Sequence, residues 1–69
     1  MNWDTFEGRW TQVRGRIREE WGKLTDDDIT VVAGQRDQLI GVLQNRYGIA
    51  RAELERQVEE FERRVMAQG

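Results

Sequence analysis

One helix ends and the next begins within Trp21-Gly22-Lys23-Leu24-Thr25-Asp26-Asp27-Asp28. Gly22 predicts the end of the first helix, because the residue that follows a helix often needs a positive φ. Thr25 can accept a hydrogen bond from an exposed N–H group of the next helix, and the aspartates that follow lie at its positive end. Asp28 stands three residues after Thr25, where a capping box places an acidic or amide side chain.

Working outward, the glycines recur every seven residues in two runs, and a shift of 26 residues superimposes the runs. The shift also pairs Trp21 with Tyr47 and Ile17 with Leu43. The pattern indicates a duplicated helical unit, each copy closed by an aromatic residue followed by glycine. The two runs are Gly8, Gly15, Gly22 and Gly34, Gly41, Gly48.

Apolar residues recur at the three- and four-residue spacing of one helix face, and they predict helices over 3–21, 26–33, 35–47 and 50–66. We therefore expect an all-α fold: a single small domain over residues 1–69, in which four helices form two hairpins packed across each other. The predicted inward positions, helix by helix, are Trp3, Phe6, Trp10, Val13, Ile17, Trp21; Ile29, Val32, Ala33; Leu39, Ile40, Val42, Leu43, Tyr47; and Ala50, Leu54, Val58, Phe61, Val65.

The composition argues against catalysis and against several classes of partner. The chain contains no Cys or His, and it lacks Ser, so it has no conventional nucleophile, imidazole base or zinc-ligand set. None of its 13 acidic residues falls on a predicted buried face. We expect no enzyme and no catalytic, cofactor-binding or metal-ligating residue. A net charge of -2 makes nucleic acid an unexpected partner. We also expect no transmembrane segment and a cytoplasmic monomer or weak homo-oligomer.

Several apolar and acidic features have a second interpretation. The three tryptophans could stack on single-stranded nucleic acid, but their phase with the apolar stripe favours the core. The helix over 3–21 could lie on a membrane with its apolar face down, although any core-facing helix shows the same pattern. Asp26–Asp28 could ligate a hard cation, but the electrostatics of a helix start explain them.

A basic line repeats at seven-residue spacing through Arg9, Arg16 and Lys23 and could bind phosphates. Acidic residues such as Glu19 and Glu20 interleave with it, which favours a solvated face of mixed charge.

Three glycines fall inside predicted helices, where each costs about 1 kcal/mol relative to Ala. They are Gly8, Gly15 and Gly41, and the helical phase places all three away from the apolar stripe. Three interpretations stay open: tolerated surface glycine, close approach of another helix or a second chain, and helices weakened so that folding is conditional. From the phase, we expect that Ala at Gly15 and Gly41 stabilises the fold.

The segment from Trp21 to Asp28, together with the run Gln44-Asn45-Arg46-Tyr47-Gly48, resembles the CsbD-like family of small bacterial proteins. Residues 2–62 carry the resemblance, although Arg stands where the family often has Lys, notably at Arg14, Arg16 and Arg18. The resemblance implies a general stress-response role and a bundle of crossed hairpins similar to SAM-like domains. It implies no catalytic or ligand-binding residues.

Together these observations predict a non-enzymatic stress-response protein that acts by binding or protection. The alternatives are a hydrophilin-like protectant that folds conditionally, and a weak binder of anionic polymers.

Overall fold

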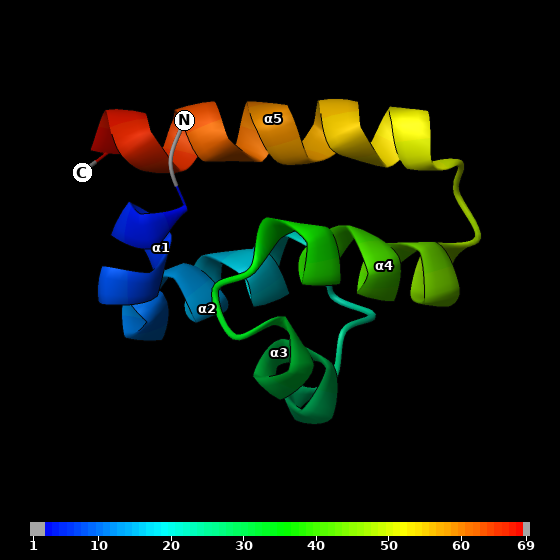
Figure 1. Ribbon diagram of the computed structural model, residues 1–69, viewed down its shortest axis with the longest axis horizontal. Helices are drawn as coiled ribbons and strands as arrows, with labels where there is room; N and C mark the ends of the chain where they lie inside the picture. Colours follow the sequence, from blue (N-terminus) through cyan, green and yellow to red (C-terminus); the bar gives the residue numbers. More distant parts are fainter. Residues whose placement is uncertain (1–2, 69) are drawn as a thin grey trace.

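The computed structural model describes residues 3–68, which form five α-helices and no strand within that range. These are α1 (Asp4–Gly8), α2 (Trp10–Glu20), α3 (Asp26–Val32), α4 (Arg36–Tyr47) and α5 (Arg51–Gln68). Figure 1 shows α5 along one side of the molecule, with α4 running beneath it in the opposite direction and α1 near its C-terminal end. The prediction of an all-helical fold is confirmed.

Apolar side chains from all five helices meet in one core. Burial of these side chains stabilises helices of 5 to 18 residues, most of which would be marginal in isolation. Most of the predicted inward positions are confirmed. The buried hydrophobic residues are Phe6, Val13, Ile17, Trp21, Leu24, Ile29, Val32, Leu39, Ile40, Leu43, Leu54, Val58 and Phe61.

The predicted helix over 3–21 is wrong, because the chain breaks into α1 and α2 at Arg9. Arg9 has φ -119° and ψ 26°, outside the helical region. The break lets α1 turn toward α5, so that Phe6 is only 1% exposed and its ring meets that of Phe61 edge-on at 6.3 Å. Tertiary packing therefore overrides the continuous apolar spacing.

The predicted start of α3 is confirmed. The backbone N–H of Asp28 donates to the Thr25 hydroxyl at 3.2 Å, and the backbone N–H of Thr25 donates to Asp28 Oδ2 at 3.1 Å. This is a complete capping box. The end of α2 differs from the prediction: Gly22 follows the helix closely, but its φ does not lie in the left-handed region.

The left-handed positions lie instead at the ends of α3 and α4. Ala33 (φ 45°) and Gly34 (φ 79°) terminate α3, and Gly48 (φ 65°) terminates α4. Ala33 was expected to face inward but is exposed, because the left-handed turn directs it out of the helix face. Ala50 is also exposed rather than part of the stripe, since α5 begins only after it.

Of the three tryptophans, Trp21 is buried, whereas Trp3 and Trp10 are half-buried against the core. The expectation that all three are largely buried is confirmed, with Trp21 the most deeply placed. Trp3 precedes α1 and Trp10 begins α2, so each lies at the start of a helix rather than within one.

The interior glycines occupy open positions. A Cβ atom at Gly8, Gly15 or Gly41 would meet nothing within 4 Å. Close approach of another helix of this chain is therefore wrong as their explanation, and approach by a second chain stays a prediction. Gly34 is the crowded one, because a Cβ there would lie 2.6 Å from Glu7 Cγ.

Candidate functional site

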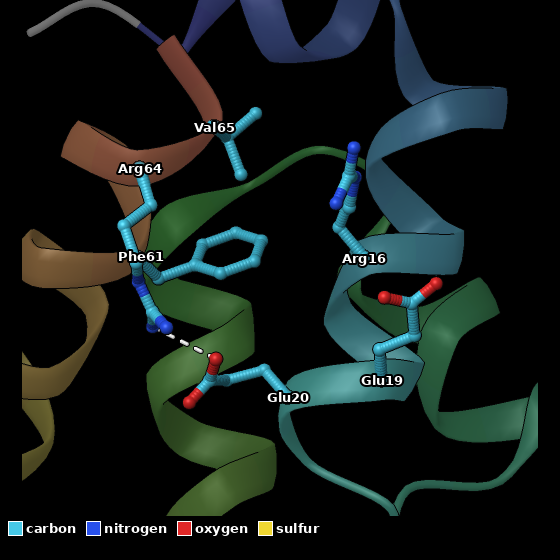
Figure 2. Close-up of a pocket in the computed structure, with 6 residues that line it drawn as sticks. All are labelled: Arg16, Glu19, Glu20, Phe61, Arg64 and Val65. Carbon is cyan, nitrogen blue, oxygen red and sulfur yellow. Dashed lines mark ion pairs between the residues drawn. The ribbon is translucent and has the colours of Figure 1, made fainter. Parts of the chain in front are cut away.

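A shallow groove of about 250 Å³ runs between α2 and α5. Figure 2 shows Phe61 and Val65 of α5 extending into it, with Arg16 on the facing helix. Phe61 is buried and Val65 half-buried, so they form a small apolar floor beneath a charged rim. We call this the α2–α5 groove; its lining residues are Arg16, Glu19, Glu20, Phe61, Arg64 and Val65.

The two arginines of the groove differ in their partners. Arg64 reaches across to Glu20, with 2.8 Å between the guanidinium Nη2 and the carboxylate oxygen (Figure 2). Arg16 forms no ion pair with any side chain in the described part of the chain. Beside its apolar floor, the groove therefore presents a guanidinium with no ion-pair partner among the described side chains.

A buried polar contact ties the start of the chain to α5. Glu62 is only 6% exposed, and its Oε1 atom accepts hydrogen bonds from Trp3 Nε1 at 2.7 Å and from Arg36 Nε at 2.9 Å. The two donors explain how a carboxylate is retained in this position, since an unpaired buried charge would be strongly destabilising. We call these three residues the Glu62 node.

The Glu62 node contradicts the expectation that no carboxylate lies on a buried face. A signal was present, since Glu62 lies four residues after Val58 and three before Val65, in phase with the stripe of α5. Phe61, directly before it, is apolar and also lies in phase, so spacing alone assigns the inward position to Phe61. The donors Trp3 and Arg36 are distant in sequence and could not be identified from spacing.

Two of the three aspartates after Thr25 pair with arginines, and Asp28 also forms the capping box of α3. Asp26 pairs with Arg18, and Asp28 accepts two hydrogen bonds from Arg46, at 2.7 and 3.0 Å. The Arg46 guanidinium first, and then the Thr25 backbone N–H, hold the pKa of Asp28 below its ordinary value. Among the side chains that the structure describes, no group of three or more acidic residues is arranged so that it could hold a metal ion.

The three residues of the predicted basic line do not lie on one helix. Arg9 lies at the break, Arg16 lines the α2–α5 groove, and Lys23 follows the end of α2. The Lys23 ammonium lies 5.1 Å from the centre of the Tyr47 ring, and its backbone N–H donates to the Tyr47 hydroxyl at 3.2 Å. Only Arg16 of the three therefore belongs to the candidate site.

Residues 4–56 match the family model described as CsbD-like. This is more than half of the chain. The chain belongs to the CsbD-like family.

Relatives of this CsbD-like protein cover nearly its full length. The UPF0337 protein YjbJ of Escherichia coli (strain K12) is 48% identical over 93% of this chain and 93% of its own. The protein of the same name in Salmonella typhimurium is 50% identical over 93% of this chain and 91% of its own. A UPF0337 protein of Pectobacterium atrosepticum is 50% identical, with 90% of each chain covered.

Nothing in these names assigns an activity to the CsbD-like chain. Among the helices within residues 3–68, none is long and apolar enough to cross a membrane.

Proposed function

We propose that this protein is a non-enzymatic, cytoplasmic stress-response protein that binds extended segments of partially unfolded proteins in the α2–α5 groove. Membership of the CsbD-like family supports the stress role. The observation that carries the binding role is Arg16, which has no ion-pair partner among the described residues and lies beside the apolar floor of Phe61 and Val65. The SAM-like crossing of two hairpins stays a proposal about the fold, which a solved structure would test.

The chemistry of the groove selects its occupant. An apolar side chain can lie on the half-buried Val65, beside the small exposed part of Phe61, and an acidic side chain next to it can neutralise Arg16. The shallow form and the paired charges at Arg64 and Glu20 suit an extended segment, held weakly, rather than a small molecule enclosed on most sides. Weak and reversible binding is what protection of unfolding proteins requires.

The test compares two charge reversals on α2. Arg16→Glu places a carboxylate in the groove, and Arg14→Glu makes the same change in net charge at an exposed site that does not line it. The probe is a reduced, carboxymethylated polypeptide that cannot fold, titrated into isotopically labelled protein. We expect Arg16→Glu to weaken binding about fivefold or more, and Arg14→Glu to change it far less.

The same pair of variants tests the stress role. A strain of the native host that lacks the gene should regain stress survival with the wild-type or Arg14→Glu gene, and not with the Arg16→Glu gene. Equal weakening by both variants would show that net charge, and not the groove, controls binding. If the Arg16→Glu and Arg14→Glu genes restored survival equally, the stress role would not depend on the groove.

Two alternatives have distinct signatures. The hydrophilin-like alternative predicts a non-cooperative circular dichroism melt, whereas the shared core of all five helices favours a cooperative helical transition. The anionic-polymer alternative predicts salt-dependent retention on nucleic acid, which the net charge of -2 does not favour.

A further inference from the structure

The junction between α1 and α2 breaks an apolar spacing that is continuous in the sequence. Phe6 and Trp10 continue the apolar spacing of α2, as a single helix would require. Only Arg9 departs from helical geometry, and no side chain caps α1 or α2 at their N-termini. The backbone N–H of Arg9 already bonds the Phe6 carbonyl at 3.2 Å, and that of Val13 bonds the Arg9 carbonyl at 3.0 Å. Rotation at one residue would therefore restore a continuous helix.

Contacts with distant segments hold the bent conformation. The Phe6 ring packs on Phe61, and Trp3 donates to Glu62 in the Glu62 node. Glu7 accepts a hydrogen bond from Gln35 Nε2 at 3.2 Å. A five-residue helix has almost no stability of its own, so contacts such as these retain α1 against α5 and the start of α4. Helix continuity through Arg9 opposes them.

We propose that Arg9 is a hinge and that α1 exchanges between two copies of this chain. In the straight conformation, α1 extends α2 and leaves its own α5. It then docks on the second copy, with Phe6 against the partner's Phe61 and Trp3 on the partner's Glu62. The surface that α1 vacates fits the α1 of a second copy, because both copies have the same sequence. In a two-fold exchange, each copy covers the vacated surface of the other.

The exchange links oligomeric state to the candidate site without depending on the proposed function. Phe61 is at once the docking surface of Phe6 and part of the floor of the α2–α5 groove. Monomer and exchanged dimer therefore retain the same contacts at Phe61, and the transient open state is the one that uncovers it. High protein concentration favours the exchanged dimer by mass action.

The test uses two substitutions at the hinge. Arg9 is exposed and pairs with no side chain in the described part of the chain, so Arg9→Ala and Arg9→Gly remove the same charge and differ mainly in helix propensity. Ala favours the continuous helix over Gly about fivefold. Two hinges straighten in each dimer, so the association constant of Arg9→Ala should exceed that of Arg9→Gly about 25-fold in analytical ultracentrifugation.

A second measurement identifies the contact. In the Arg9→Ala dimer, made by unfolding and refolding a mixture of labelled and unlabelled chains, nuclear Overhauser effects should connect Phe6 of one copy with Phe61 of the other. Equal association constants for the two hinge variants would overturn the proposal. So would a dimer with no such contact between copies, since it would form through another surface.

Discussion

α2 and α4 are the two copies of the sequence repeat, and they begin at equivalent positions, Trp10 and Arg36, 26 residues apart. Their faces differ. α4 buries three residues fully and packs against both α3 and α5, whereas α2 buries only Val13 and Ile17. Similar sequences therefore form equivalent helices, while the neighbours of each helix decide how much of it is covered.

The ends of the two copies differ in the same way. Gly22 and Gly48 are equivalent in the repeat, but only Gly48 is left-handed. Gly8 and Gly34 are also equivalent, yet Gly8 ends α1 in open space and Gly34 is crowded by Glu7. Glycines at equivalent positions of the repeat therefore have different structural roles. Substitutions at these positions should measure the difference in stability.

The largest effect is expected for the pair Gly34 and Gly8. Gly34→Ala should lower the free energy of unfolding by about 2–4 kcal/mol, because a left-handed φ disfavours Ala and the new Cβ would lie 2.6 Å from Glu7 Cγ. Gly8→Ala meets open space and should not destabilise the fold. Urea denaturation followed by circular dichroism measures both; similar midpoints for the two variants would contradict the structure around Gly34.

The next effect separates the ends of α2 and α4. Gly48→Ala should cost about 1–2 kcal/mol, the penalty of the left-handed conformation for a residue with a Cβ, although no atom obstructs the added methyl group. Gly22→Ala, its equivalent, should leave the free energy of unfolding nearly unchanged. Thermal melts of the two variants give the comparison. An equal loss of stability at both would indicate that Gly22 also has a left-handed φ, as the sequence predicted.

The middle glycines of the two copies, Gly15 and Gly41, should respond in the same way to substitution. Gly15→Ala and Gly41→Ala should each raise stability by roughly 0.5–1 kcal/mol, since both lie within helices with open space around them. The effects should add, because the two helices present these positions separately. Loss of stability at one site in a monomeric sample would indicate that its surroundings differ from those described, and loss of self-association would indicate contact with a second chain.

The smallest effect concerns the connections of α3 to each copy. Asp28 has a lowered pKa in the fold, so its stabilising contribution is complete above the ordinary carboxyl pKa of about 4 and is lost as pH falls through the lowered value. Arg46→Gln should therefore flatten the acid side of the stability–pH curve. Arg18→Gln removes the partner of Asp26, whose side chain is 76% exposed, and should leave the curve close to wild type.

Features that depend on neighbours in sequence were predictable from the sequence. The capping box of Thr25 and Asp28 spans four residues, and the helical stop at Gly48 follows from an aromatic-glycine pair at the end of an apolar stripe. The stripes of α4 and α5 likewise follow from spacing alone. In the candidate site, the spacing predicted that Phe61 and Val65 lie on the apolar face of one helix.

Tertiary structure decided what spacing could not. Helix phase places Arg16 and Phe61 on their own helices, but only the packing of α2 against α5 brings them into one groove. The break at Arg9 depends on contacts with Phe61 and Glu62, more than 50 residues along the chain. Sequence spacing reflects the interactions within one helix and the face that the helix can bury. It does not reflect contacts with segments distant in sequence, and here those contacts determine where the helix ends and which carboxylate is buried.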